Sequence, residues 1–96
     1  MNPIRFHPVA ESEMIDAAAW YEAKRVGLGR RYLSSVQDAI NRIELNPELF
    51  PFVEGDVRRC LAKTFPFGIL FRVEPNLIEI TAVMHLHRDP DDWRTR

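Results

Sequence analysis

Histidine and arginine side chains gather where the last apolar stretch of the sequence ends. His85, His87 and Arg88 follow a predicted strand over residues 77–84. An imidazole can transfer protons near neutral pH, and a guanidinium can stabilise the charge that develops on a phosphate during cleavage. These residue types would suit a ribonuclease that works without a metal ion.

A structural turn is the alternative interpretation of the same segment. Residues 89–92 read Asp-Pro-Asp-Asp, a turn-forming run in which one carboxylate can pair with Arg88. Trp93 would then pack back onto the sheet. The two histidines with the first of these aspartates are weak evidence for a metal site. We therefore predict neither a metal ion nor another cofactor.

Three further arginines lie on predicted strands. Arg58 and Arg59 are adjacent, so their side chains leave opposite faces of the sheet. We expect one to point into a concave surface and the other to be a solvated charge at the sheet edge. Arg72 lies among apolar residues, where it either holds an anionic group or pairs with Glu79 on the facing strand.

An aromatic pair and a lone cysteine complete the chemically notable residues. Trp20 and Tyr21 are neighbours on a predicted helix, so only one of them can pack on the sheet, and core packing explains Tyr21. The other is expected to line a groove for a partner. Cys60 is predicted to be a small buried hydrophobic residue without an activated thiol.

Composition limits the class of protein. The 96 residues are 46% hydrophobic, and we expect them to form one domain over residues 1–96. A single cysteine excludes an internal disulfide, the start of the chain lacks a signal-peptide run, and no stretch approaches the roughly 18 apolar residues of a membrane span. These features predict a cytoplasmic protein.

Charge is divided unevenly along the chain. The net charge is −1, made up of −3 in residues 1–56 and +2 in residues 57–96. We expect an acidic helical half and a mildly basic sheet half that carries the binding functions. The near-neutral balance does not favour non-specific nucleic-acid binding, which rests on many phosphate contacts.

Hydrophobic periodicity predicts a short strand, two helices and three further strands. Alternation of period two predicts strands, and apolar residues three and four apart predict helices. Breaks fall at Gly27-Leu28-Gly29, at Asn46-Pro47 and at Pro75-Asn76. The expected ranges are strand 4–6, helix 9–24, helix 29–45, loop 47–56, and strands 57–63, 67–74 and 77–84. This β-α-α-β-β-β order is an α+β fold, with an antiparallel-rich sheet packed against a helical hairpin.

The same patterns predict which side chains share a face. The core stripe of the second helix is expected to be Leu33, Val36, Ile40 and Ile43. The loop is expected to be anchored by Leu49, Phe50 and Phe52. In the last strand, one face is expected to carry Ile78, Ile80, Ala82 and Met84, and the other Leu77, Glu79, Thr81, Val83 and His85.

Taken together, the order and spacing of these motifs resemble the RelE/ParE family of toxins from type II toxin–antitoxin systems, also called plasmid stabilisation proteins. The motifs that carry the resemblance are Trp20-Tyr21-Glu22, Gly27-Leu28-Gly29, Asn46-Pro47, Phe65-Pro66-Phe67-Gly68-Ile69, and the segment from His85 to Trp93. The resemblance implies a toxin neutralised by a cognate antitoxin in a hetero-oligomer. RelE-like members cut messenger RNA on the ribosome, whereas ParE-like members inhibit DNA gyrase without known catalysis.

Departures from RelE place the chain closer to the ParE-like branch. Gly68 stands where RelE has an arginine, and Arg59-Cys60-Leu61 keeps one cation of a lysine pair. The resemblance therefore implies a gyrase inhibitor, with a RelE-like endoribonuclease as the alternative. The nuclease residues would then be Arg59, His85, His87 and Arg88. The residues expected to bind the target or the antitoxin are Arg59, Lys63, Arg72, His85, Arg88 and Trp93.

Overall fold

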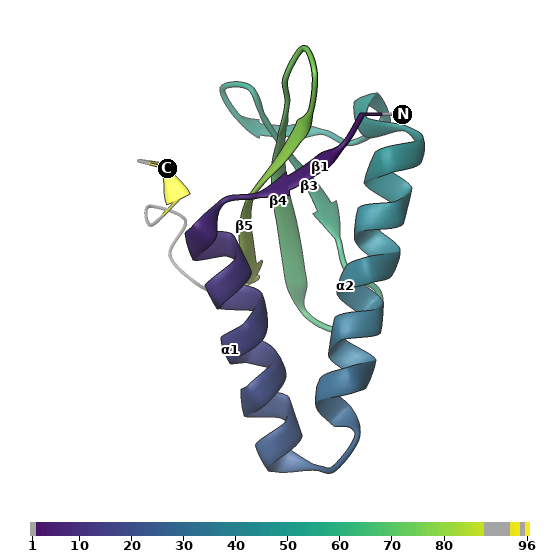
Figure 1. Cartoon of the computed structure of the whole chain (residues 1–96), viewed down its shortest axis with the longest axis vertical. Helices are drawn as coiled ribbons and strands as arrows, with labels where there is room; N and C mark the ends of the chain where they lie inside the picture. Colours follow the sequence, from purple (N-terminus) through teal and green to yellow (C-terminus); the bar gives the residue numbers. More distant parts are fainter. Residues whose placement is uncertain (1, 88–92, 95) are drawn as a thin grey trace.

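The computed structural model describes residues 2–87, 93–94 and 96, which form two helices and a five-stranded sheet (Figure 1). The elements in chain order are β1 (Ile4–Phe6), α1 (Pro8–Lys24), α2 (Leu28–Leu45), the 3-10 helix η1 (Pro47–Leu49), β2 (Phe52–Glu54), β3 (Val57–Leu61), β4 (Phe67–Val73) and β5 (Ile78–His85). The predicted α+β fold is confirmed. The expected loop over 47–56 is wrong in part, because it contains β2 as a short, exposed edge strand.

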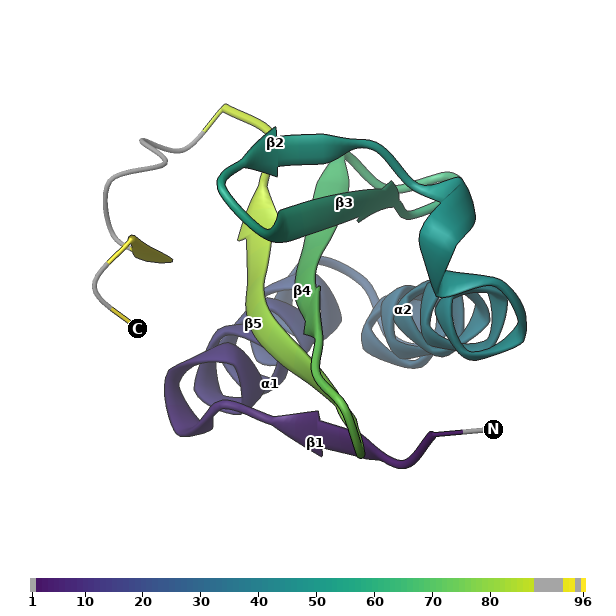
Figure 2. The same cartoon turned by 90° about the horizontal axis from the view of Figure 1, so that it is seen from above.

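The sheet has the strand order β1-β5-β4-β3-β2. β1 runs parallel to β5, and the other neighbouring strands are antiparallel. The helices form an antiparallel hairpin against one face of the sheet (Figure 2), as predicted. The opposite face, which we call the open face, carries no helix among the described residues.

Glycine and a carboxylate shape the link between the helices. Gly27 has a φ of 88°, in the left-handed region that glycine adopts at little cost. Glu22 accepts hydrogen bonds from the backbone N–H groups of Gly27 and Gly29 at 3.0 Å each. These hydrogen bonds lower the pKa of Glu22. A side chain at Gly29 would lie 2.6 Å from the carbonyl oxygen of Ala18, so this glycine allows the helices to approach closely.

The core face of α2 is rotated slightly from the predicted stripe. Val36, Ile40 and Ile43 are buried as expected, but Leu33 is 39% exposed. Tyr32 takes its place in the interior, where its ring packs against Tyr21, Phe65 and Phe67 at centroid distances of 4.9–5.6 Å. The prediction for Leu33 is therefore wrong, because the large aromatic ring on the preceding residue fills the space between the hairpin and the sheet.

A β-bulge interrupts the pairing of β4 with β5. Leu70 lies opposite Ala82 and Phe71 lies opposite Ile80, so Thr81 is an extra residue on β5. An extra residue shifts the alternation of side chains by one position beyond it. Even-numbered residues of β5 therefore face the helices before Thr81, and odd-numbered residues face them after it.

The bulge overturns the predicted faces of the last strand. Ile78 and Ile80 pack toward the helices together with Val83, whereas Ala82 and Met84 pack on the open face. A regular strand would have placed the even-numbered residues on one side throughout. The prediction is thus correct before Thr81 and wrong after it.

The expected anchors of the loop behave differently from one another. Phe50 packs on the core, with its ring 5.9 Å from that of Phe71. Leu49 and Phe52 are exposed, so the prediction is wrong for these two residues. The ring of Phe52 instead makes a cation–π contact with Arg58, whose guanidinium carbon lies 3.9 Å from the ring centroid.

Candidate functional site on the open face

Apolar side chains cover part of the open face. Val57, Leu70, Ala82, Met84 and Trp93 form a second buried cluster, separate from the core under the helices. Trp93 is 4% exposed, so its indole packs on the sheet as the structural-turn interpretation expected. The open face is therefore a second packing surface.

A hollow of about 310 Å³ lies beside this cluster. We call it the open-face hollow. Its lining is Val53, Glu54, Arg59, Gly68, Leu70, Met84, His85, Leu86, Trp93 and Arg94. Two of these residues, Arg94 and Glu54, form an ion pair in which Nε and Oε2 are 2.6 Å apart. Arg59 forms no ion pair with any described residue, so its charge is available at an apolar concavity.

Gly68 makes room for Arg59. The two residues lie on neighbouring strands, and a β-carbon at Gly68 would come within 3.1 Å of Arg59 Cδ and 3.3 Å of Cγ. The stem of Arg59 thus lies over the space that a side chain at position 68 would fill. The arginine that the RelE resemblance expects at this position is replaced by the arginine of the adjacent strand.

The other two strand arginines are occupied. Arg58 donates hydrogen bonds to the carbonyl oxygens of Glu48 and Phe50 at 3.1 and 2.8 Å, so it is a structural cation rather than a solvated one. Of the adjacent pair, Arg59 therefore faces the concave surface. This agrees with the expectation that one of the two would do so.

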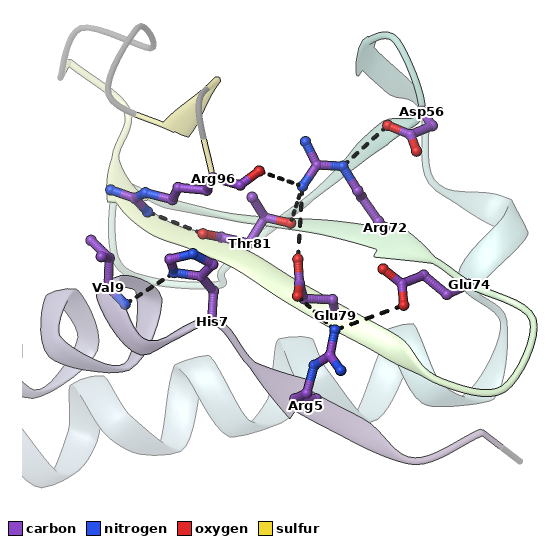
Figure 3. A network of polar contacts seen from close by, with 9 residues as sticks. All are labelled: Arg5, His7, Val9, Asp56, Arg72, Glu74, Glu79, Thr81 and Arg96. Atoms are coloured by element: carbon purple, nitrogen blue, oxygen red, sulfur yellow. Dashed lines mark hydrogen bonds and ion pairs between the residues drawn. The ribbon is translucent and has the colours of Figure 1, made fainter.

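Arg72 is held in a network on the open face (Figure 3). Its guanidinium lies 3.2 Å from Asp56 and 3.7 Å from Glu79, and it donates to the Thr81 hydroxyl at 3.4 Å. Arg5 of β1 approaches the same Glu79 carboxylate at 2.9 Å. The predicted pairing of Arg72 with Glu79 is confirmed, and its guanidinium has little remaining capacity for an external anion.

Sequence analysis did not find the most buried ion pair among the described residues. The guanidinium of Arg96 contacts both carboxylate oxygens of Glu13, at 2.7 and 3.0 Å, and both side chains are about 10% exposed or less. Arg96 also donates to the carbonyl oxygen of Thr81 at 3.0 Å, and Glu13 accepts from the Val83 N–H at 3.2 Å. The pair therefore fixes the bulge of β5 to α1. No local pattern signals it, because the partners are 83 residues apart.

The ring of His85 points away from Arg59, although both residues line the open-face hollow. His85 lies opposite Phe67 in the sheet, and the two rings are 5.3 Å apart on the helix side. Its Nδ1 accepts a hydrogen bond from the His87 N–H at 3.1 Å. The bulge at Thr81 therefore turns the imidazole of His85 toward Phe67, although His85 still lines the open-face hollow together with Arg59. Arg88 lies outside the described residues.

Lys63 also lies away from the open-face hollow. It is in the turn between β3 and β4, where its carbonyl oxygen accepts a hydrogen bond from the Ser35 hydroxyl of α2. Of the predicted binding residues, Arg59, His85 and Trp93 line the hollow. The structure does not bring Lys63 and Arg72 to the same place.

Cys60 and Tyr21 lie in the interior as predicted, whereas the partner groove expected at Trp20 stays a prediction. Cys60 is fully buried, and burial raises the pKa of its thiol. Tyr21 packs in the core, whereas Trp20 is exposed on the outside of α1, with the Lys24 ammonium 4.7 Å from its ring centroid. Within the described residues, no group of three potential metal ligands comes together, and no helix is long and apolar enough to cross a membrane.

Comparison with known proteins identifies the family. Residues 4–90 match the profile of the ParE toxin of type II toxin-antitoxin systems, parDE. The fold is similar to a solved chain of the chromosomal ParDE toxin–antitoxin system from P. aeruginosa, with a TM-score of 0.67 and 18% identity over 91% of this chain and 98% of that one. A search of curated protein sequences gave no significant match. The extent of the family match shows that the chain belongs to the ParE family of type II toxins.

Proposed function

We propose that this toxin inhibits growth by binding DNA gyrase in the cytoplasm and is neutralised by a cognate antitoxin. The observation that carries the proposal is the match to the ParE family over residues 4–90. The solved relative is from a ParDE toxin–antitoxin system, which supports an antitoxin as a partner.

The open-face hollow suits a protein partner. Arg59 offers a guanidinium that forms no ion pair among the described residues, and it lines the hollow together with Leu70, Met84 and Trp93. An arginine next to an apolar floor can hold a carboxylate while the neighbouring apolar side chain of the partner is buried. We propose that Arg59 and Trp93 contact the target, the antitoxin or both in turn.

The arrangement gives less support to RNA cleavage. A metal-free nuclease needs a proton-transfer group and a cation close to one phosphate. Here Arg59 and His85 both line the open-face hollow, but the His85 ring packs on Phe67 at the helix side. Cys60 is buried with a raised pKa, so it does not supply a nucleophile in their place.

Two assays on the purified chain test the proposal. We expect inhibition of DNA supercoiling by gyrase and no cleavage of ribosome-bound messenger in a translating extract. Induced expression should slow growth, and co-expression of the small gene next to it should restore growth. Codon-specific messenger cleavage together with unimpaired supercoiling would establish the RelE-like alternative instead.

A further inference from the structure

The cations without ion-pair partners do not lie where the charge of the sequence suggested. Of the lysines and arginines that the structure describes, Arg5, Arg42, Arg72, Arg94 and Arg96 form ion pairs with carboxylates. Apart from Arg58 and Arg59, the remaining cations belong to the helical hairpin and the turn beside it, and they are Lys24, Arg25, Arg30, Arg31 and Lys63. Most of the described cations of the sheet half are therefore paired, and apart from Arg58 and Arg59 the cations without an ion pair lie on the helical side.

Three of these cations surround one hollow. A concavity of about 400 Å³ is bordered by Arg30, Arg31 and Lys63, and its other residues are Ser34, Ser35, Asp38, Thr64 and Phe65. We call it the hairpin hollow. The carboxylate of Asp38 is engaged by Arg42 at 3.1 Å, so it does not neutralise the three cations. Three cations and three hydroxyl-bearing side chains thus border this concavity.

The helix dipole does not explain two of the cations, of which only Arg30 is attracted by the Glu22 carboxylate at the start of α2. Arg30 and Arg31 stand close to the amino end of α2, whose first turn contains no acidic residue. The helix dipole places partial positive charge at that end, so cationic side chains there are unfavourable. By the same rule, Lys24 and Arg25 at the carboxyl end of α1 are favourable.

The backbone of Thr64, another residue of the hairpin hollow, also has an unfavourable conformation. Thr64 has a φ of 75°, and it is the one non-glycine residue with positive φ in the described part of the chain. A β-branched residue in this region is strained, and such strain clusters at functional sites. The strained turn presents Lys63 next to α2, where the Ser35 hydroxyl holds its carbonyl oxygen. Two departures from local preference therefore meet at the hairpin hollow.

We infer that the hairpin hollow binds the phosphate backbone of double-stranded DNA. Arginine, lysine, serine and threonine side chains are the usual donors to DNA phosphates, and all four types border this concavity. Lys24 and Arg25 add two further cations at the carboxyl end of α1, next to the link between the helices. The number of cations is small, so binding is weak and independent of sequence. This surface is separate from the open-face hollow, which leaves that hollow free for a protein partner.

Fluorescence anisotropy of a labelled, mixed-sequence DNA duplex with the full-length chain tests the inference without gyrase. Across about 50 to 200 mM salt, the logarithm of the affinity should fall with the logarithm of salt, with a slope of roughly −0.9 for each phosphate contacted. Arg31→Ala should weaken binding at low salt and reduce the magnitude of the slope by roughly one. Arg31→Lys should retain most of both, because it keeps the charge.

Arg5→Gln is the matched control. It removes the same charge from an exposed side chain of β1, on a different element from the hollow. An equal loss of affinity in Arg5→Gln and Arg31→Ala would overturn the inference, since it would reflect net charge alone. The inference would also be overturned if the chain bound an acidic peptide such as polyglutamate but no DNA. That result would assign the hollow to an acidic protein. Gyrase inhibition is measured separately, so loss of one property with retention of the other distinguishes this inference from the proposed function.

Discussion

Arg96 and Glu13 hold each other through two contacts of 2.7 and 3.0 Å, although 83 residues separate them in the chain. The same pair reaches the bulge of β5 through Thr81 and Val83. One ion pair thus joins the end of the described chain, the first helix and the irregular point of the sheet.

Arg96→Ala should destabilise the protein strongly. Removing the guanidinium leaves the Glu13 carboxylate buried without its main partner, and breaking a buried pair in this way costs about 3–5 kcal/mol. Urea unfolding followed by circular dichroism measures the change. In Arg5→Gln, which breaks an exposed pair, the loss should stay below about 1 kcal/mol. Similar losses in both variants would show that the Arg96 pair does not stabilise the fold as described.

Arg59→Ala should weaken the proposed complex with gyrase or antitoxin while leaving the fold intact. The loss of a charged anchor beside apolar side chains corresponds to about 2 kcal/mol, or roughly thirtyfold in Kd. Titration calorimetry and a growth assay measure the effect, again with Arg5→Gln as the control. Unchanged toxicity and unchanged antitoxin affinity in Arg59→Ala would exclude the open-face hollow as the contact surface.

Gly68→Ala should act through Arg59. The added methyl group would come within 3.1 Å of Arg59 Cδ, a flexible side chain that can move away. We expect a small change in stability but a loss of binding in the same direction as in Arg59→Ala. In the double variant Gly68→Ala/Arg59→Ala, the methyl group should add nothing further. Additive losses in the double variant would mean that Gly68 acts independently.

Tyr32→Phe should leave the stability unchanged or raise it slightly. The Tyr32 hydroxyl is buried without a hydrogen-bond partner in the described structure, and burial raises the pKa of this group. Its removal relieves an unsatisfied polar atom, whereas the ring keeps its contacts with Tyr21, Phe65 and Phe67. Tyr32→Ala, which removes the ring, should cost about 3–5 kcal/mol. A loss above about 1 kcal/mol in Tyr32→Phe would reveal a partner for the hydroxyl, such as a buried water.

Cys60 should make the stability fall at alkaline pH. Burial raises the pKa of its thiol in the folded state, so the unfolded chain releases the proton first as the pH rises. The stabilisation is complete below the unfolded thiol pKa of about 8.5 and is lost above it, with a slope of up to about 1.4 kcal/mol per pH unit. In Cys60→Ala the free energy of unfolding should stay level until the tyrosines titrate near pH 10. Parallel curves for the two proteins would contradict this assignment.

Local patterns predicted most of the elements because they depend on short-range physics. Both helices and the strands β1, β3, β4 and β5 follow from periodicity and from turn-forming residues. β2 was missed since its three residues are all exposed, and it carries no alternation of buried and exposed positions. The buried stripe of α2 was displaced by one residue because Tyr32 competes with Leu33 for the same space.

The candidate site was less accessible to sequence reasoning. A single extra residue at Thr81 reverses the faces of β5, and no residue type in the strand marks it. That reversal turns the His85 ring toward Phe67 on the helix side, although His85 still lines the open-face hollow together with Arg59. Whether a cation forms an ion pair depends on carboxylates far along the chain, as the pairs of Arg96 with Glu13 and of Arg72 with Asp56 illustrate. Net charge by segment therefore could not indicate where free positive charge remains.

The position of β5 also determines when the toxin can fold during synthesis. β5 lies between β1 and β4, and Ile4 of β1 pairs with Ile78, far along the chain. The helical hairpin can form while the ribosome is still translating, since its contacts are local. β1, however, has no partner until β5 has emerged from the exit tunnel. A nascent chain therefore lacks the complete five-stranded sheet until β5 has been made, and a transcript interrupted before β5 yields a chain in which β1 has no strand to pair with.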